Sequence, residues 1–203
     1  MHKEIFNQDQ IDLLPLVRLF KREFYLAGGT AIGLHIGHRR SIDFDLFKYN
    51  SINSKSIIDK FSGFNYPYLV TRRVTEQLNV TIHGVKFTFY QYPFKISCSE
   101  NLDDILRMPE LINLAAMKAY ALGRRSKWKD YIDMYFVLKD HFSINQISER
   151  AVLIYDQLFS EKLFRAQLSY FDDIDFTEQV EFIGSSIPES VIKEFLTEKA
   201  IDL

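Results

Sequence analysis

The chain has 203 residues, of which 47% are hydrophobic and 26% are charged, and its formal net charge is −2. This size and apolar content allow one domain or two small ones with a proper core, which excludes a disordered or fibrous protein. No uncharged apolar run reaches the length of about 18 residues that a membrane span needs, and the single cysteine, Cys98, cannot form an internal disulfide. We therefore expect a soluble cytoplasmic protein without a membrane span.

Charge is distributed unevenly along the chain. Between Arg107 and Lys129 there are six basic residues and one acidic residue, whereas between Asp172 and Asp202 there are nine acidic residues and two lysines. Clusters of one sign act locally even when the net charge is small. The first segment is expected to attract phosphate and the second to repel it.

The first half of the chain mixes helical and strand-like patterns. Apolar residues at helical spacing predict a helix over about residues 9–22, and a second short helix is expected at 54–61. Strands are predicted at 23–27, 42–47, 68–76, 78–83 and 85–92, with the last three paired antiparallel.

From residue 111 onward the pattern is helical. Two helices, around 111–122 and 131–138, are joined by a basic turn at 123–127, and three more are expected at 144–158, 161–168 and 189–201. The fold class predicted is α/β (α+β), with an α/β core over residues 1–100 and a helical region over 101–203 packed on that core. The helical region would close one side of a cleft and offer a surface to partners.

The stretch from residue 28 to residue 45 carries the chemistry. Gly28-Gly29 breaks the strand before it, and the first-turn amides and Thr30 hydroxyl of the following helix favour an anion such as phosphate. Residues 42–47 then alternate, so Asp43 and Asp45 share one face of a strand while Ile42, Phe44 and Leu46 enter the core. Paired carboxylates beside a phosphate site suit Mg²⁺.

These residues resemble a known family. Gly28-Gly29-Thr30, followed by Gly37-His38-Arg39, Ser41, Asp43 and Asp45, is similar to the signature of the AbiEii/AbiGii-type nucleotidyltransferases. A second signature is matched by Lys118, Arg125, Lys129, Asp130 and Asp133. The family belongs with the DNA polymerase beta superfamily and includes toxins of type IV toxin–antitoxin (abortive infection) modules. The resemblance covers residues 24–138, and the two motifs together are more specific than either alone.

The resemblance implies a nucleotidyltransferase with a small mixed β-sheet, flanking helices and a helical C-terminal half. Its substrate would be a nucleoside triphosphate, its acceptor an RNA (tRNA) or protein hydroxyl, and its partner a cognate antitoxin. The implied catalytic residues are Asp43, Asp45, Lys118 and Asp130, with Mg²⁺ on the first two. The implied nucleotide-binding residues are Gly28, Gly29, Thr30, Arg39, Ser41, Lys118, Arg125 and Lys129.

One position departs from the family's pattern. Polymerase-beta relatives usually carry a third carboxylate on the strand beside the Asp pair, and the aligned residue in this chain is Thr88. A hydroxyl is a poorer magnesium ligand and a weaker proton acceptor than a carboxylate. Glu76 or Asp130 could substitute, or one metal could suffice; the sequence leaves these alternatives open.

The helical half poses similar choices. Lys118 lies on a helix face otherwise made of core residues, so we expect its ammonium to reach a phosphate. Asp130 and Asp133 are one turn apart near a helix start, where carboxylates often act as caps. We expect Asp130 to lie beside a metal or to pair with Lys118. Asp133 is expected either to cap the helix or to orient Arg125. For Arg124 and Lys127, solvated turn charges and nucleic-acid contact are equally compatible with the sequence.

Two rival functions stay open. A nucleotide-binding module without catalysis is favoured by Thr88, and an antitoxin-like interaction protein that retains the fold is favoured by the acidic C-terminal segment. A metal-dependent hydrolase lacks a histidine at suitable spacing, since only His38 and His83 are candidates.

Overall fold

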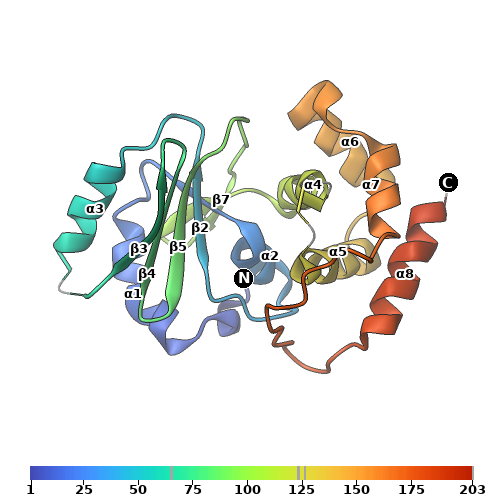
Figure 1. The fold of residues 1–203 in the computed structure, drawn as a ribbon, viewed down its shortest axis with the longest axis horizontal. Helices are drawn as coiled ribbons and strands as arrows, with labels where there is room; N and C mark the ends of the chain where they lie inside the picture. Colours follow the sequence, from blue (N-terminus) through green and yellow to red (C-terminus); the bar gives the residue numbers. More distant parts are fainter. Residues whose placement is uncertain (65, 123, 126, 203) are drawn as a thin grey trace.

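A seven-stranded mixed sheet lies beside a helical half in the computed structural model, which describes residues 1–64, 66–122, 124–125 and 127–202 (Figure 1). The strands are β1 (Tyr25–Ala27), β2 (Phe44–Lys48), β3 (Leu69–Val74), β4 (Gln77–Ile82), β5 (Val85–Gln91), β6 (Glu100–Leu102) and β7 (Leu106–Met108), in the order β3-β4-β5-β2-β1-β7-β6. Neighbouring strands are antiparallel except for β2 with β5 and β1 with β7, which are parallel.

The helices flank this sheet and form most of the second half of the chain. They are α1 (Gln8–Arg18), α2 (Gly28–Ile36), α3 (Ser54–Ser62), α4 (Leu111–Leu122), α5 (Trp128–Asp140), α6 (Ile144–Tyr155), α7 (Glu161–Leu168) and α8 (Glu189–Ile201), with short 3-10 helices at Lys3–Ile5 and Asp156–Leu158. The predicted α/β class and the antiparallel pairing of β3, β4 and β5 are confirmed.

Several element predictions need correction. Strands β6 and β7 were not predicted, because three residues are too few for alternation to show; they extend the sheet past residue 100, and the division into two domains stays a prediction. The first helix ends at Arg18 rather than near residue 22. Ile42 is 46% exposed instead of buried, since β2 begins only at Phe44. Gly123 and Ser126 of the predicted basic turn lie outside the described residues.

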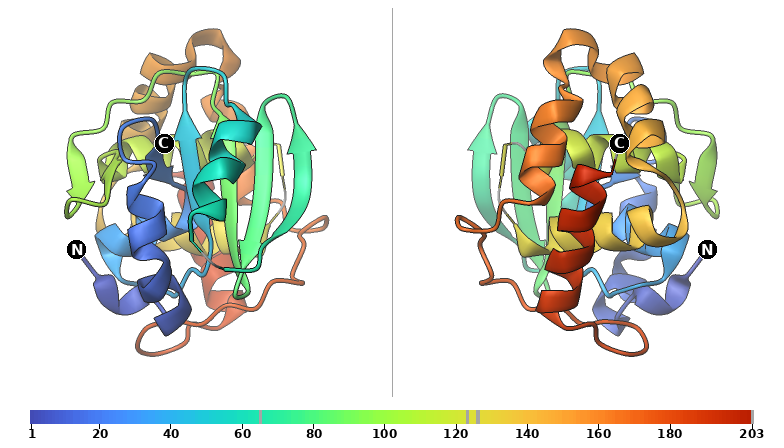
Figure 2. Two further views of the ribbon diagram at one scale, coloured as in Figure 1. Left: turned by 90° about the vertical axis from the view of Figure 1, so that its left-hand side faces the viewer. Right: turned by 90° about the vertical axis from the view of Figure 1, so that its right-hand side faces the viewer.

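One face of the sheet is covered by α1 and α3, which lie in front of it in the left-hand view of Figure 2. Phe20, which follows α1, and Phe61 from α3 pack on Phe89, with ring centroids 4.7 Å and 5.8 Å away. Phe44 and Leu46 of β2 point to this same buried side and are fully buried. Because side chains alternate along a strand, Asp45 must face the opposite side.

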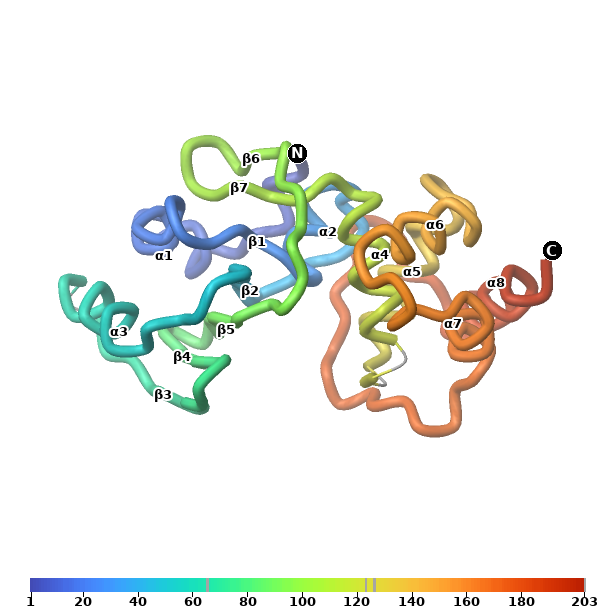
Figure 3. The backbone as a smooth tube through the Cα atoms, turned by 90° about the horizontal axis from the view of Figure 1, so that it is seen from above, coloured from blue at the N-terminus to red at the C-terminus, as the bar shows by residue number. Residues whose placement is uncertain are grey.

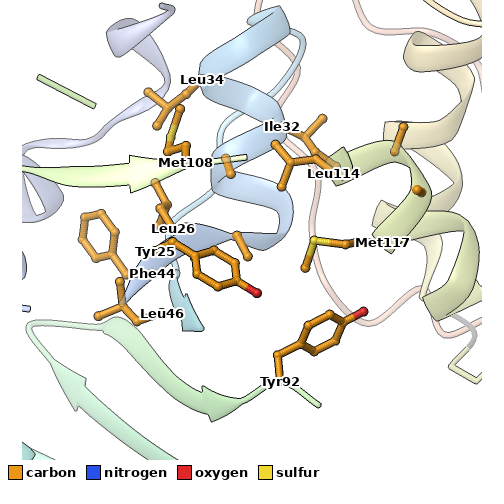
Figure 4. Close-up of a cluster of buried hydrophobic side chains, with 14 of the residues drawn as sticks. Tyr25, Leu26, Ile32, Leu34, Phe44, Leu46, Tyr92, Met108, Leu114 and Met117 are labelled. Atoms are coloured by element: carbon orange, nitrogen blue, oxygen red, sulfur yellow. The ribbon is translucent and has the colours of Figure 1, made fainter. Parts of the chain in front are cut away.

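The opposite side of the sheet faces α2 and the helical half. Figure 4 shows Ile32 of α2 beside Leu114 of α4, with Met117 and Tyr92 near them, so a hydrophobic contact joins the helical half to the sheet. Helices α6, α7 and α8 lie beyond α4 and α5, away from the sheet (Figure 3). Within the described residues no helix has the length and apolar character needed to cross a membrane.

The segment 169–188, which we call the connecting segment, leaves α7 and returns toward the sheet before α8 begins (Figure 1). It makes one bridge with the chain before α5, between Lys127 and Asp175, and one with the chain before β2, between Arg39 and Phe182. The backbone amide of Arg40 donates to the carbonyl of Glu181 at 2.8 Å. The connecting segment is thereby held beside the elements that carry the predicted site.

Candidate active site

The turn between β1 and α2 is shaped around Asp45. Gly28 has φ +68°, and a Cβ at this position would lie 2.0 Å from the Asp45 Oδ2. Register places Ala27 opposite Asp45 on the neighbouring strand. Only glycine combines this left-handed backbone with such a close approach. The predicted strand break is therefore the surface against which the carboxylate rests, and α2 starts there without a side-chain cap.

Thr30 has a structural part in this turn. Its side chain is buried, and its hydroxyl contacts the Ser41 Oγ at 2.9 Å and the backbone carbonyl of Asp43. The hydroxyl thus ties the start of α2 to the residue before β2. Thr30 and Ser41 were both predicted to bind phosphate, and that role stays a prediction.

Nearby cations compensate the charges of Asp43 and Asp45 only in part. Burial raises the pKa of Asp43 above its ordinary value, and burial together with Asp43 raises the pKa of Asp45. Across the described residues neither carboxylate forms an ion pair. Such a pair favours a cation that is not a side chain, as expected for ligands of a divalent metal.

Thr88 stands beside this pair. It is opposite Asp45 in the parallel register of β2 and β5, and it is 8% exposed. This is the strand position predicted for a third carboxylate. Of the residues that the structure describes, no three His, Cys, Asp or Glu side chains group closely enough to hold a metal ion. The protein itself supplies two carboxylates, which is the number Mg²⁺ commonly takes when substrate phosphates complete its shell.

Lys118 and Asp130 form a buried ion pair between α4 and α5. The Lys118 Nζ lies 2.6 Å from the Asp130 Oδ1, and Arg125 donates to the same carboxylate through its Nε at 2.8 Å. Burial opposes ionisation of Asp130, but the two cations outweigh it and hold its pKa below the ordinary range. The predicted pairing of Asp130 with Lys118 is confirmed. Arg125 is half exposed and keeps a free edge.

Asp133 is the centre of a second, deeper network. The fully buried carboxylate accepts from the Arg39 Nε at 2.8 Å and Nη2 at 3.0 Å, contacts the His38 Nε2 at 2.7 Å and pairs with the Lys118 Nζ at 2.8 Å. Burial opposes its ionisation, yet Arg39 and Lys118 keep its pKa well below normal. The prediction that Asp133 would be a helix cap or orient Arg125 is wrong.

The same network changes the interpretation of Arg39. It was predicted to bind nucleotide, but its guanidinium is 2% exposed and bonded to Asp133, with the Nη2 only 2.6 Å from where a Gly29 Cβ would be. Arg39 therefore supports the turn from beneath and has no exposed edge for a phosphate. Sequence spacing could not show this, since Arg39 and Asp133 are 94 positions apart.

A cleft of about 370 Å³ joins the two halves of the site. Gly28, Asp45 and Thr88 line one wall, and Lys118 and Arg125 line the opposite wall. At its other end the lining is mostly aromatic and apolar: Phe47, Tyr90, Tyr92, Met117 and Tyr120. The Arg124 guanidinium stacks 3.4 Å from the centroid of Tyr120. The cleft thus has a charged end suited to phosphates and an aromatic end suited to a planar base. The sequence analysis missed this aromatic end.

The connecting segment pairs with two lysines at the start of α5. Glu178 contacts the Lys127 ammonium, and its other oxygen lies 3.4 Å from the Lys129 Nζ. The backbone amide of Trp128 donates to the carbonyl of Asp175 at 3.1 Å. Lys129, predicted to bind nucleotide, lies near enough to Asp43 to lower its pKa but is shared with Glu178. The acidic segment is therefore held on the basic turn by opposite charge.

Comparison with known proteins defines the fold. The chain is similar to MenT4, a nucleotidyltransferase toxin of Mycobacterium tuberculosis, over 95% of its length and 81% of that chain, with a TM-score of 0.59 and 13% identity. The Megavirus polyadenylate synthase matches 66% of the chain and 32% of its own, with a TM-score of 0.51 and 13% identity. The chain has the nucleotidyltransferase fold. Protein JHP933 of Helicobacter pylori covers 98% of the chain and 90% of its own, with a TM-score of 0.56 and 14% identity.

Sequence comparison is less informative. No protein-family model matches the chain. An uncharacterized protein of Aquifex aeolicus, aq_aa25, is 34% identical over 126 residues. That match spans 59% of this chain and 59% of the relative, so the chain covers about three fifths of its length.

Proposed function

We propose that the protein is a Mg²⁺-dependent nucleotidyltransferase that transfers a nucleotidyl group from a nucleoside triphosphate to an RNA (tRNA) or protein hydroxyl. The observation that carries this proposal is Asp45, which is held against the turn at Gly28, lines one cleft with Lys118 and Arg125, and has Asp43 near enough to raise its pKa. The nucleotidyltransferase fold supports it.

The residues around the cleft have distinct parts in this proposal. Asp43 and Asp45 would hold Mg²⁺, which when bound neutralises phosphate charge and aligns the triphosphate. Arg125 offers its free edge to the phosphates, while Lys118 contributes positive charge from beside Asp130. The amides of Gly28 and Gly29 at the uncapped start of α2 favour the same anion.

Proton transfer is the step in which this chain differs from the family's pattern. The acceptor hydroxyl oxygen forms a bond to the α-phosphorus, the bond to the bridging oxygen breaks, and pyrophosphate leaves. Thr88 cannot accept the hydroxyl proton, so we assign that proton to solvent and the rate acceleration to positioning and charge neutralisation. A non-catalytic nucleotide-binding or antitoxin-like protein is the second candidate, and the Thr88 position favours it.

We further propose that the protein acts as the toxin of a type IV toxin–antitoxin system, with a cognate antitoxin as partner. The motifs shared with the AbiEii/AbiGii type and the likeness in fold to MenT4 support this proposal. Co-expression with the product of an adjacent gene should restore growth that the protein alone inhibits.

Labelled transfer tests the enzymatic proposal. Purified protein, Mg²⁺ and each radiolabelled nucleoside triphosphate are incubated with a cell extract, and aliquots are treated with nuclease or protease before electrophoresis. We expect a labelled species that nuclease removes, which identifies RNA as the acceptor. Label removed only by protease would identify a protein acceptor. Triphosphate binding by calorimetry with no label in any lane would favour the non-catalytic candidate.

A further inference from the structure

A second hollow, of about 580 Å³, lies at the end of β2 that points away from Gly28. Its lining includes Arg22, Lys48, Lys95 and Arg107 around Tyr25 and Tyr49, and we call it the basic hollow. Lys48 is the last residue of β2. Arg22 lies before β1, Lys95 lies after β5, and Arg107 belongs to β7. Four segments distant in sequence thus bring positive charge to one place.

The positive charge of the basic hollow is largely free. Its one acidic lining residue, Glu23, is occupied by Lys60 at 2.7 Å and by Lys48 at 3.3 Å. Arg22, Lys95 and Arg107 are exposed and form no ion pair with any described residue. Free cations grouped around a hollow favour a ligand with several negative charges.

This hollow contrasts with the basic turn before α5. There, Lys127 and the adjacent Lys129 of α5 are already paired with Glu178, and Arg125 is paired with Asp130. Arg124 forms no ion pair with a described residue, but its guanidinium donates to the carbonyl of Tyr120 at 2.8 Å and stacks on the Tyr120 ring. A polyanion would have to displace the Glu178 carboxylate from the turn, whereas it would meet no competing acid at Arg22, Lys95 or Arg107. The basic hollow is the better polyanion surface, although the turn has the denser cluster of basic residues in the sequence.

An exposed aromatic ring narrows the chemistry of the ligand. Tyr49 is 48% exposed, and the Lys95 ammonium lies 5.3 Å from its ring centroid. Cations beside an exposed aromatic ring form the usual platform for single-stranded nucleic acid, because phosphates contact the cations while a base stacks on the ring. An acidic protein surface would use the cations and leave the ring without a planar partner.

The position of the basic hollow links it to the cleft. Tyr25 lines the basic hollow and Phe47 lines the cleft, and their ring centroids are 6.2 Å apart. We propose that the basic hollow is a second binding site, which holds the phosphodiester backbone of single-stranded RNA with a base stacked on Tyr49. This RNA would be the acceptor, a part of the inference that rests on the proposed function, while RNA binding itself does not.

The test is fluorescence anisotropy of fluorescein-labelled oligouridylate, with no triphosphate present, over a series of salt concentrations. The variant is Lys95→Glu with Arg107→Glu. The control is Lys139→Glu with Lys162→Glu, two exposed lysines of the helical half that give the same change in net charge. Circular dichroism melting confirms that all forms fold.

We expect the Lys95/Arg107 variant to lose about 1.4 from the slope of log K against log salt, at about 0.7 per phosphate contact. Tyr49→Ala should weaken binding at least about fivefold, the lower end of base–aromatic stacking. The control should keep wild-type affinity and slope. Wild-type affinity and slope in the Lys95/Arg107 variant would overturn the site.

Polyglutamate serves as the competing ligand. Displacement of the RNA by polyglutamate at equal charge concentration would overturn RNA as the ligand in favour of an acidic protein. Triphosphate binding and labelled transfer are measured on the same preparations. If the protein transfers label but the Lys95/Arg107 variant binds RNA like the wild type, this inference alone is refuted. If RNA binding depends on Lys95 and Arg107 but no label is transferred, the enzymatic proposal is refuted and the RNA-binding site is supported.

Discussion

Replacement of Asp133 by asparagine should destabilise the protein strongly. The substitution keeps the shape of the side chain but removes a charge that is fully buried and bonded to Arg39, His38 and Lys118. Arg39 would then remain buried with its charge uncompensated, because among the described residues its other hydrogen bond goes to the backbone carbonyl of Arg40. Breaking a buried ion pair from one side costs about 3–5 kcal/mol.

For a chain of this length about 1 kcal/mol changes Tm by roughly 2–4 °C, so Asp133→Asn should lower Tm by about 6–20 °C at pH 7. Asp140→Asn is the control, since Asp140 is exposed on the same helix, and it should change stability by no more than about 0.5 kcal/mol. The assay is thermal melting by circular dichroism. Equal Tm values for the two variants would refute the assignment of Asp133 as a buried structural anchor.

The pH dependence of stability gives an independent check of the ion pair between Asp133 and Arg39. The pKa of Asp133 is lower in the folded state than its ordinary value of about 3.9, so its contribution to the free energy of unfolding is present above that value. The contribution is lost as the pH falls through the folded-state pKa. The Tm difference between wild type and Asp133→Asn should be constant near neutral pH and shrink below about pH 4. A difference that grows on acidification would contradict the direction of the pKa shift.

Three further predictions follow from the walls of the cleft. Gly28→Ala should lower Tm by more than Gly84→Ala. Both glycines have positive φ, but of the two only Gly28 would bring its new Cβ against another group, the Asp45 carboxylate. Equal shifts in Tm would refute that close approach. Lys118→Met should lower Tm and weaken triphosphate binding by about 1.5–3 kcal/mol in calorimetry, and unchanged affinity would exclude Lys118 from phosphate binding. Thr88→Asp should raise the pKa of Asp45 further and lower Tm without metal. It should also tighten Mg²⁺ binding measured by titration calorimetry. Mg²⁺ affinity equal to wild type would show that position 88 does not face the metal.

Local patterns in the sequence were sufficient for the central elements of the fold. Alternation placed Asp45 on the face of β2 opposite Phe44 and Leu46, and Gly28 marked the strand end where a left-handed backbone is required. The alignment that put Thr88 beside the Asp pair agrees with the register of β2 and β5. These features depend on residues close in sequence or on strand periodicity.

Partner choice could not be read in the same way. Asp130 and Asp133 lie one helical turn apart on α5 and share Lys118. Asp133 also binds Arg39 and His38, whereas Asp130 binds Arg125. Which charges meet is decided by how α5 packs against the turn before β2, a contact between distant segments. The pairing of Glu178 with the basic turn has the same origin, since charge clusters in a sequence do not show that they lie together.

The central claim concerns Asp43 and Asp45. Their pKa values are raised, so their ionised forms reduce stability as the pH rises above the ordinary value for aspartate, and the cost is present at pH 7. The double variant Asp43→Asn with Asp45→Asn should therefore melt at or above the wild-type Tm without metal.

The decisive measurement is label transfer from a radiolabelled triphosphate by the wild type and the double variant, with Tm followed in parallel with and without Mg²⁺. The account predicts transfer and a rise in Tm with Mg²⁺ for the wild type, and neither for the folded double variant. Wild-type levels of transfer by the double variant would contradict the account.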